Sequence, residues 1–375
     1  MTTRPRPVTQ GLAVSAGPMP RRGHEARVTV EDVGRAAGVS PATVSRVVNQ
    51  NPRVTPETRA AVQRAIEQLG YVPNRAARSL MTRRSDSVGV VILEPPGRLF
   101  ADPFFGLLML GIGAGLSERE IQLVLLMAPT AQDEERVERY LAAGHVDGAI
   151  LVGPHGEDPL PRRLAEAGIP VVLSGRPFDQ EGVSFVDSDN RTGARSAVLH
   201  LAERGRTRIA TIHGTLDLTS GRDRLEGYRD GLRVAGLAHD PTLEAAGDFS
   251  TVGAAEAMRS LLERHPDLDG VFAASDSMAA TALIVLGESG RRVPEDVAVV
   301  GFDDTPTATA SRPSLSTVRQ PIEAMGREMA RLLLQHVDAP AAAPQRIIFP
   351  TELIVRESSG GATPHDDSGG SRPRR

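Results

Sequence analysis

A short stretch near the N-terminus carries side chains suited to contacts with DNA. If residues 41–49 form a helix, Val44, Val47 and Val48 share one face, and the opposite face carries Pro41, Ala42, Ser45, Arg46 and Asn49. Arg46 is the one long hydrogen-bond donor on that outward face, and its planar fork suits a bidentate contact with guanine. Shorter polar groups suit phosphates, which fix register without reading bases; these are Ser40, Thr43, Ser45, Asn49 and Thr55. The pattern predicts a helix that reads DNA.

The elements that would position this helix are visible in the same segment. Thr29 can cap a first helix whose apolar side is Val33, Ala36 and Ala37, and Gly38 can make a tight turn. Ser40 can cap the second helix, with Pro41 at its first position. This arrangement is typical of a helix-turn-helix, although an ordinary helical hairpin with an exposed arginine fits these residues equally well when they are taken alone.

The charge is distributed unevenly along the chain. The net charge is −4, but the first 84 residues hold fourteen arginines and five acidic residues, a net of +9. The remainder has 29 basic and 42 acidic residues, a net of −13. A short basic segment followed by a long acidic one indicates that the basic segment binds a polyanion.

Composition limits the class of protein. A chain of 375 residues is long enough for two or three domains. It has no cysteine, which excludes disulfides and thiolate chemistry. The absence of a long apolar run and the arginines and prolines of residues 1–25 predict a cytoplasmic protein. The nine histidines show no metal-ligand spacing and no nucleophile elbow is present, so we expect no cofactor, no metal and no enzymatic activity.

From Val88 onward, short β-rich runs alternate with helical ones in two successive sets. This alternation is typical of parallel-sheet βαβ units, and two sets predict two α/β lobes. The predicted fold class is an all-α helix-turn-helix head with an α/β body of two doubly wound lobes. The glycine-rich run from Gly111 to Leu116 lies within a helical pattern and lacks the third glycine of a dinucleotide fingerprint, so it predicts no nucleotide site.

The run from Val28 to Ile92 resembles the lactose-repressor (LacI/GalR) family of bacterial transcriptional regulators almost end to end. The residues that carry the resemblance are AGVSPATVSRVVNQ, VTPETRAAVQRAIEQLGYVPN and RAARSL. In that family the stretch matching Pro73 to Leu80 is a hinge helix that forms on DNA, and the leucine matching Leu80 enters the minor groove. The resemblance also implies DNA contacts for Thr29, Tyr71, Asn74 and Ala77. Pro41 and Ala42 replace larger residues of the lactose repressor, so base reading is expected to depend on Arg46, apolar contact from Ala42 and DNA shape.

The resemblance continues to Glu357, where the family has a body like periplasmic sugar-binding proteins with a ligand cleft between two lobes. The matching words include DPFFGLLMLGI, SGRDRLEGYRDGL and VPEDVAVVGFDD. Carried over residue by residue, the family's effector contacts fall on Phe105, Asp189, Arg224, Phe249, Ser275 and Asp303. Structural roles are open alternatives for Arg224, as a surface arginine, and for Phe249, as a core residue. Asp276 follows Ser275, where many relatives have asparagine, and either caps a helix or contacts ligand.

The expected domain organisation has five parts. They are a disordered extension (1–27), the DNA-binding domain (28–72), the hinge helix and linker (73–84), the effector-binding and dimerisation domain (85–357), and a disordered tail (358–375). The tail has no leucine heptads like those of the family's tetramers, so a homodimer on a palindromic operator is expected.

The function expected from these observations is a repressor that a small effector controls, with a sugar as the first expectation and a purine or nucleoside as the alternative. The sequence leaves open whether the effector releases or strengthens DNA binding. A solute-binding protein is the alternative from another class, but it requires a signal sequence and no DNA-binding head. A sugar-converting enzyme is a further alternative, for which no acid and base pair can be located.

Overall fold

A computed structural model of the chain describes residues 28–48, 51–71, 84–178 and 182–360. It divides the chain into two compact units, Met1–Met81 and Thr82–Arg375, which we call the head and the body. The predicted DNA contacts at Asn49, Asn74, Ala77 and Leu80, and most of the predicted hinge, lie outside the described residues.

The described part of the head consists of three helices, α1 (Val30–Ala37), α2 (Pro41–Val48) and α3 (Pro56–Leu69). Thr29 forms a capping box with Asp32 at the start of α1, and Gly38 ends that helix in the left-handed conformation at φ +69°. Both features agree with the sequence prediction. Thr55 caps α3 by accepting the backbone N–H of Thr58 at 3.3 Å.

Valine side chains from all three helices form the core of the head. Val33, Val44 and Val62 are completely buried there. The prediction that Ala36 faces this core is wrong, because the buried side of the eight-residue α1 is centred on Val33 and Gly34 and leaves Ala36 exposed. A Cβ on Gly34 would lie 2.9 Å from the carbonyl oxygen of Val39, so this glycine allows the turn to pack closely against α1.

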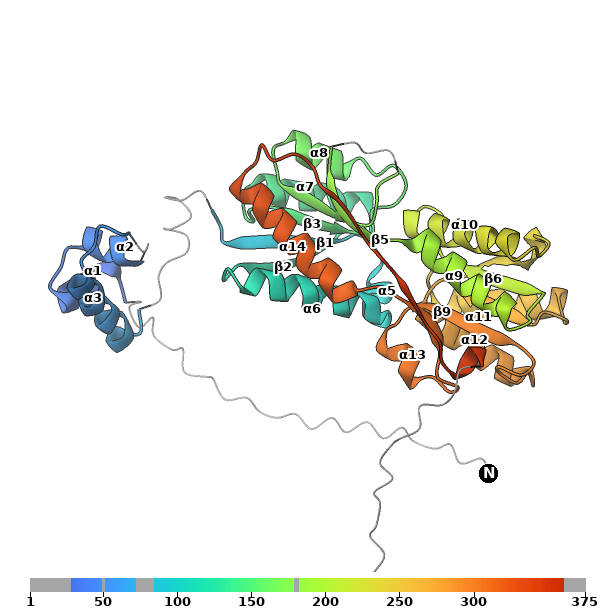
Figure 1. Ribbon diagram of the computed structural model, residues 1–375. Helices are drawn as coiled ribbons and strands as arrows, with labels where there is room; N and C mark the ends of the chain where they lie inside the picture. Colours follow the sequence, from blue (N-terminus) through green and yellow to red (C-terminus); the bar gives the residue numbers. More distant parts are fainter. Residues whose placement is uncertain (1–27, 49–50, 72–83, 179–181, 361–375) are drawn as a thin grey trace, which may run out of the picture. The chain divides into compact units, whose positions relative to one another are not determined.

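The body contains two six-stranded sheets, each covered by helices on both faces (Figure 1). The N-terminal lobe has the strand order β11-β5-β4-β3-β1-β2, and all its paired strands are parallel. Helices α6 and α14 cover one face of this sheet and α7 and α8 the other. Its elements are β1 (Ser87–Ile92), α5 (Pro96–Ala101), α6 (Pro103–Ser117), β2 (Gln122–Met127), α7 (Ala131–Ala142), β3 (Ala149–Val152), α8 (Leu160–Glu166), β4 (Val171–Ser174), β5 (Ser184–Ser188), α14 (Ile322–Asp338) and β11 (Arg346–Phe349).

The C-terminal lobe repeats this plan with the strand order β12-β10-β9-β8-β6-β7, in which only β12 is antiparallel. Helices α9 and α10 cover one face, and α11 and α12 the other. Its elements are α9 (Asn190–Glu203), β6 (Ile209–His213), α10 (Thr219–Val234), β7 (Glu244–Ala246), α11 (Thr251–Arg264), β8 (Gly270–Ala273), α12 (Asp276–Glu288), β9 (Ala298–Asp303), α13 (Pro306–Ala310), β10 (Ser316–Arg319) and β12 (Glu352–Ile354), with 3₁₀ turns at Pro241–Leu243 and Glu357–Ser359. The two predicted α/β lobes are therefore confirmed.

The chain crosses between the lobes three times, after β5, after β10 and after β11. The crossing segments bond to one another, since Asp189 N–H donates to the carbonyl of Phe349 at 2.8 Å and Ser188 Oγ donates to Gln320 Oε1 at 2.8 Å. A connection of three short, mutually bonded segments is a hinge between two rigid lobes.

Two sequence interpretations are settled by packing in the body. The run from Gly111 to Leu116 lies inside α6, where a Cβ on Gly111 would lie 2.2 Å from the carbonyl oxygen of Glu323 on α14. Gly111 and Gly115 of this run therefore allow α6 to pack closely against α14. The predicted tail boundary is too early, because Ser358 and Ser359 are buried and Ser358 Oγ donates to the carbonyl of Val299 at 2.6 Å.

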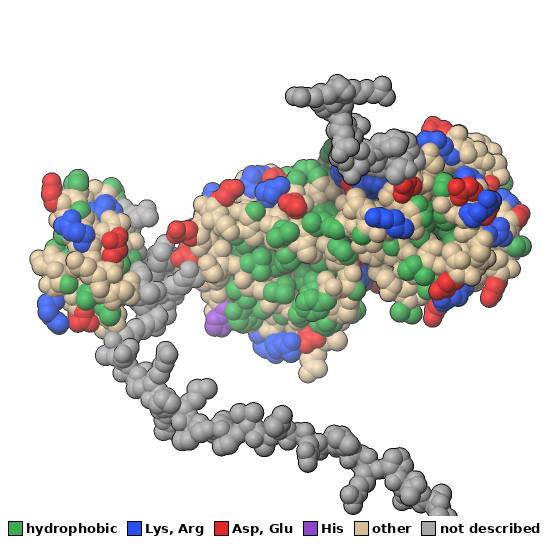
Figure 2. Space-filling view, turned by 90° about the horizontal axis from the view of Figure 1, so that it is seen from below, with side chains coloured by type: hydrophobic (Ala, Val, Ile, Leu, Met, Phe, Trp, Pro, Cys, Tyr) green, Lys and Arg blue, Asp and Glu red, His purple; other side chains and the backbone are tan. Residues whose placement is uncertain are grey.

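One surface of the N-terminal lobe is apolar. Leu110 on α6 is 64% exposed and Leu125 on the edge strand β2 is 44% exposed. Hydrophobic side chains gather on the corresponding face of the body in Figure 2. We call the face formed by α6 and β2 the α6–β2 face. No helix in the described part of the chain is long and apolar enough to cross a membrane.

Candidate functional site

Helix α2 presents the predicted DNA-reading side chains on its outer face. Pro41, Ala42 and Arg46 are exposed, whereas Val44 and Val47 are buried in the core of the head. Ser40 Oγ accepts the backbone N–H of Thr43 at 3.2 Å and lies 2.9 Å from Thr43 Oγ1, which caps the helix. The arrangement leaves the guanidinium of Arg46 as the long donor on the outer face of α2.

Four further residues of the described head are predicted DNA contacts: Thr29, Ser45, Thr55 and Tyr71. Thr29 and Thr55 cap α1 and α3, so their side chains lie at helix N-termini, where backbone N–H groups favour a phosphate. Ser45 is half-buried on α2. Tyr71 is half-buried against the valine core.

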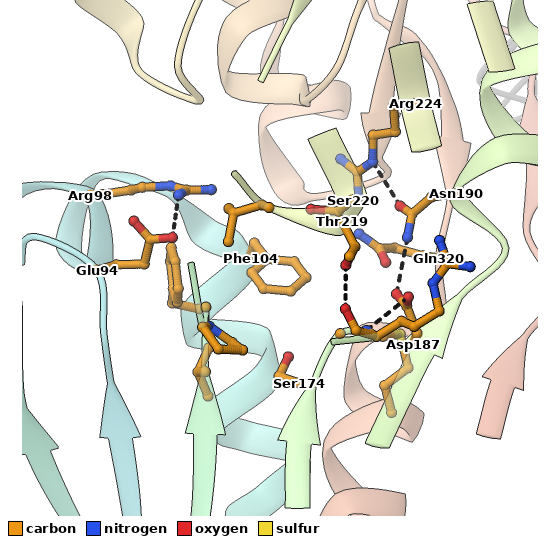
Figure 3. A pocket seen from close by; sticks show the side chains of 18 residues that line it. Glu94, Arg98, Phe104, Ser174, Asp187, Asn190, Thr219, Ser220, Arg224 and Gln320 are labelled. Carbon is orange, nitrogen blue, oxygen red and sulfur yellow. Dashed lines mark hydrogen bonds and ion pairs between the residues drawn. The ribbon is translucent and has the colours of Figure 1, made fainter. Parts of the chain in front are cut away.

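A pocket between the two lobes of the body contains Arg224 (Figure 3). We call it pocket A. It is lined from the N-terminal lobe by Glu94, Arg98, Phe104, Phe105, Ser174, Arg176 and Asp187, and from the other side by Asn190, Thr219, Ser220, Arg224 and Gln320. Its free space is about 80 Å³, so its own side chains nearly fill it in this arrangement of the lobes.

Arg224 is the centre of a buried polar network in pocket A. Its Nε donates to Asn190 Oδ1 at 2.8 Å, and its Nη1 donates to the carbonyl of Ala274 at 2.6 Å and to Asp303 Oδ1 at 3.2 Å. The guanidinium also lies 3.7 Å from the ring centroid of Phe302. The alternative that Arg224 is a surface arginine is wrong, because the residue is only 5% exposed.

Asp303 supports the pocket from beneath. It is 4% exposed and accepts both Arg224 Nη1 and Gln320 Nε2, the latter at 2.6 Å. Burial raises the pKa of Asp303 to about 7 despite the attraction of Arg224. Asp303 has a φ of +113°, a strained conformation for a residue with a side chain and one that is concentrated at functional sites.

A second pocket, pocket B, lies beside pocket A and has about 400 Å³ of free space. Phe249 lines it, together with a set of polar residues that includes Asp102, Thr215, Asp248, Ser250, Thr251 and Ser277. Phe249 is also buried in the core of the C-terminal lobe, as the alternative interpretation expected. Asp248 and Phe249 have φ values of +50° and +51°, which place the ring against Gly214, where a Cβ would lie 2.0 Å from it.

Ion pairs connect the two lobes around these pockets. His155, in the loop after β3, lies between Glu94 Oε1 at 3.1 Å and Asp217 Oδ2 at 2.9 Å, and Asp217 belongs to the C-terminal lobe. These two carboxylates raise the pKa of His155 to about 9. Arg176 of the N-terminal lobe donates to both carboxylate oxygens of Asp223 at 2.7 Å.

The six predicted effector residues do not all line one pocket. Phe105 and Arg224 line pocket A, Phe249 lines pocket B, and Asp303 holds two lining residues from beneath. The remaining two, Asp189 and Ser275, cap α9 and α12 and line neither pocket. Asp276 is the first residue of α12 rather than its cap, and accepts hydrogen bonds from Thr305 and Thr317.

Several pocket residues were missed by sequence reasoning. Glu94, Asn190 and Gln320 lie directly beyond the carboxyl ends of β1, β5 and β10. Open α/β sheets place ligands at those ends, so a position directly after a strand is a signal. The sequence patterns predict the strand before Glu94 but not the strands before Asn190 and Gln320. Arg98, on α5, had no such signal.

In the described part of the chain, no group of three potential metal ligands comes together.

A helix-turn-helix unit joined to a two-lobed body with a polar pocket between the lobes defines a ligand-responsive DNA-binding regulator. Comparison with known proteins agrees with this class. Residues 29–74 match the family model described as bacterial regulatory proteins, lacI family, and residues 198–359 match a periplasmic binding protein-like domain.

The chain is 52% identical over 334 residues to the HTH-type transcriptional regulator CelR of Thermobifida fusca, covering 88% of this chain and 98% of that protein. It is 36% identical to the ribose operon repressor of Halalkalibacterium halodurans, over 89% of this chain and 97% of that protein. The chain therefore belongs to the lacI family of bacterial regulatory proteins. It is a transcriptional regulator and not an enzyme.

Solved structures show the same fold. A complex of the transcriptional regulator CelR with cellobiose has a TM-score of 0.71 and 50% identity, covering 88% of this chain and all of that one. A lac repressor dimer bound to operator and an anti-inducer has a TM-score of 0.78 and 28% identity, covering 88% of this chain and 99% of that one. The predicted fold class, a helix-turn-helix head with a body like periplasmic binding proteins, is confirmed.

Proposed function

We propose that this protein is a repressor that binds a palindromic operator as a homodimer and is released from it by a β-linked glucose disaccharide such as cellobiose. The observation that carries the effector assignment is the inter-lobe pocket around Arg224, considered together with 52% identity to CelR and the cellobiose in a related structure. Buried polar groups with fixed directions beside aromatic rings suit sugar hydroxyls and the apolar face of a sugar ring.

The α6–β2 face supports the dimer. Leu110 and Leu125 expose apolar surface on neighbouring elements of the N-terminal lobe, and a second copy of the chain would cover it. A related lac repressor is described as a dimer on operator DNA. Two heads held by such a dimer match the two halves of a palindrome.

The route from pocket to DNA runs through the hinge between the lobes. An effector that contacts Arg224 and Gln320 changes how the N-terminal lobe meets the C-terminal lobe, because Gln320 lies on the crossing segment after β10 and Arg224, on α10, donates to Asn190 beside the crossing segment after β5. Ser85, close to the start of the body, is bonded to Asp147 at 2.6 Å and moves with the N-terminal lobe. The lobe shift therefore alters the spacing at which a dimer presents its two heads.

Selection of bound sequences from a random DNA pool, followed by fluorescence anisotropy, tests the proposal. We expect a palindromic consensus, and we expect cellobiose to weaken binding by about tenfold or more, within the usual range of coupling free energies. Ribose and a purine nucleoside are the comparison ligands. Enrichment of no palindrome contradicts the operator assignment, tighter binding with cellobiose contradicts release, and a response to the nucleoside alone contradicts the sugar assignment.

A further inference from the structure

Arg98 separates pocket A from pocket B. It belongs to α5 of the N-terminal lobe, and Arg98 and Glu94 are the two residues that line both pockets. In Figure 3 the Arg98 side chain extends beside Glu94 toward the space that contains Phe104. Any ligand that spans the two pockets has to pass this guanidinium.

The surroundings of Arg98 hold its guanidinium in one orientation. Nη1 donates to Glu94 Oε1 at 2.5 Å, and Glu94 is 2% exposed. The guanidinium carbon lies 4.6 Å from the ring centroid of Phe249, on the C-terminal lobe, and 5.8 Å from that of Phe105. A charged fork fixed by a buried carboxylate and an aromatic face is preorganised for binding.

One donor of this fork has no partner. Arg98 Nε is buried and makes no hydrogen bond within the described structure. A buried donor without an acceptor costs free energy, and a ligand oxygen placed at Nε removes that cost. Arg206 Nε, which lines neither pocket, is also unpaired, so it is the unpaired Nε together with the position of Arg98 between the two pockets that indicates a ligand here.

Pocket B has the chemistry of a sugar subsite. Phe249 lines it together with the hydroxyl-bearing residues Ser250, Thr251 and Ser277 and the acidic residue Asp248. Its free space of about 400 Å³ contrasts with about 80 Å³ in pocket A, which has to widen by a shift of the lobes before a ring fits.

We propose that Arg98 is a specificity-determining residue that selects a two-ring sugar, by donating to ligand oxygens at the junction between a ring in pocket A and a ring in pocket B. This inference rests on the proposed sugar effector. A single ring fills one pocket and leaves the other side of Arg98 without a ligand, so the residue contributes more to a disaccharide than to a monosaccharide.

Isothermal titration calorimetry of the full chain with cellobiose and with glucose tests the proposal. For Arg98→Ala we expect the ratio of cellobiose affinity to glucose affinity to fall at least tenfold, since a hydrogen bond to a charged group is lost. Arg98→Gln keeps the length of the side chain but not its charge, and we expect an intermediate ratio. Glu94 remains paired with His155 in both variants, so the fold is expected to persist.

Arg222→Ala is the matched control. Arg222 also stacks on an aromatic ring, 4.2 Å from the centroid of Phe178, but it lines neither pocket. We expect it to leave the affinity ratio unchanged. An unchanged ratio in Arg98→Ala, or an equal loss of both sugars, overturns the role of Arg98. Wild-type protein that binds neither sugar overturns the proposed effector itself, which is a distinguishable result.

Discussion

Arg46 is the proposed base-reading residue, because the other exposed positions at the start of α2, Pro41 and Ala42, offer no side-chain donor. We predict that Arg46→Ala weakens binding to the selected operator at least tenfold, since a bidentate guanine contact contributes about 1–3 kcal/mol. Binding to unrelated DNA at low salt is expected to remain, because it depends on phosphate contacts. Anisotropy titrations with both DNAs measure the two effects.

Arg35→Ala is the control for this prediction. Arg35 is an exposed arginine of the same head, paired with Asp32 on α1, and its removal takes away the same charge. If Arg46→Ala and Arg35→Ala weaken operator and unrelated DNA equally, Arg46 acts as a phosphate contact rather than a base reader.

Arg224 and Asp303 are predicted to behave as a unit. In Arg224→Met the buried carboxyl of Asp303 loses its cation and its pKa rises further, and the groups that Arg224 bonds lose their donor. We expect the free energy of unfolding to fall by about 1–3 kcal/mol in urea titrations, the cost of buried polar groups left without a partner. In Arg224→Met/Asp303→Asn we expect at least half of that loss to be recovered, because an amide needs neither a cation nor a proton to stay neutral. Neither variant is expected to respond to cellobiose, whereas the double variant retains operator binding. If Arg224→Met and Arg224→Met/Asp303→Asn have the same free energy of unfolding, the two residues do not act as a pair.

At the scale of elements, α6 and α14 approach each other through glycine. A Cβ on Gly111 meets the carbonyl of Glu323 at 2.2 Å, whereas a Cβ on Gly113 of the same helix meets nothing within 4 Å. We predict that Gly111→Ala lowers the thermal midpoint by several degrees, since the helices must separate. Gly113→Ala is expected to leave it unchanged or raise it, because alanine favours the helix by about 1 kcal/mol. Scanning calorimetry measures the thermal midpoints of Gly111→Ala and Gly113→Ala. Their difference separates the effect of helix packing from the effect of helix propensity.

The link between the lobes through His155 predicts a dependence of stability on pH. The pKa of His155 is raised from 6.5 to about 9, so the folded state favours the protonated ring. Its contribution to the free energy of unfolding is therefore complete below about pH 6.5 and is lost as the pH rises through 9. In His155→Gln we expect a smaller decline in stability between pH 7 and pH 9 than in the wild type.

His239→Gln is the control for the pH prediction. His239 also pairs with a carboxylate, that of Glu244, but within the C-terminal lobe. Asp303, whose pKa is raised by burial, is present in the wild type and in both variants, so its contribution is common to all of them. A wild-type slope retained in His155→Gln would show that other groups cause the dependence.

The elements of this fold differ in how far the sequence predicts them. The alternation of strand and helix patterns predicts both lobes, because burial imposes different periods on strands and helices. Sequence order does not reveal that α14 and β11, which follow the strands of the C-terminal lobe, pack in the N-terminal lobe. That placement depends on long-range packing such as the contact of Gly111 with α14.

The candidate site shows the same limit. Arg224 and Phe249 were expected from the family resemblance, and they line the two pockets. Arg98 lies in a proline- and glycine-rich segment without a hydrophobic period, so its role depends on tertiary contacts with Glu94 and Phe249. A local sequence pattern cannot predict a contact between a residue and the other lobe.

At the scale of the whole molecule, the proposed dimer connects effector binding to DNA binding. One head contacts half of a palindrome, and joining two heads makes the second contact effectively intramolecular, which strengthens binding by a factor of about 10²–10⁴. The α6–β2 face is the proposed contact between copies. A charge introduced on this face would therefore reduce operator affinity without any change in the head.

We predict that Leu110→Arg converts the dimer to a monomer in sedimentation experiments and weakens operator binding at least a hundredfold, because each head then binds alone. Val234→Arg is the control, since Val234 is also an exposed apolar residue but lies at the end of α10, away from the α6–β2 face. Cellobiose binding is expected to persist in both variants, because the pockets lie within one subunit. A Leu110→Arg protein that sediments as a dimer would place the subunit contact on another face, whereas a monomer with full operator affinity would separate dimerisation from DNA recognition.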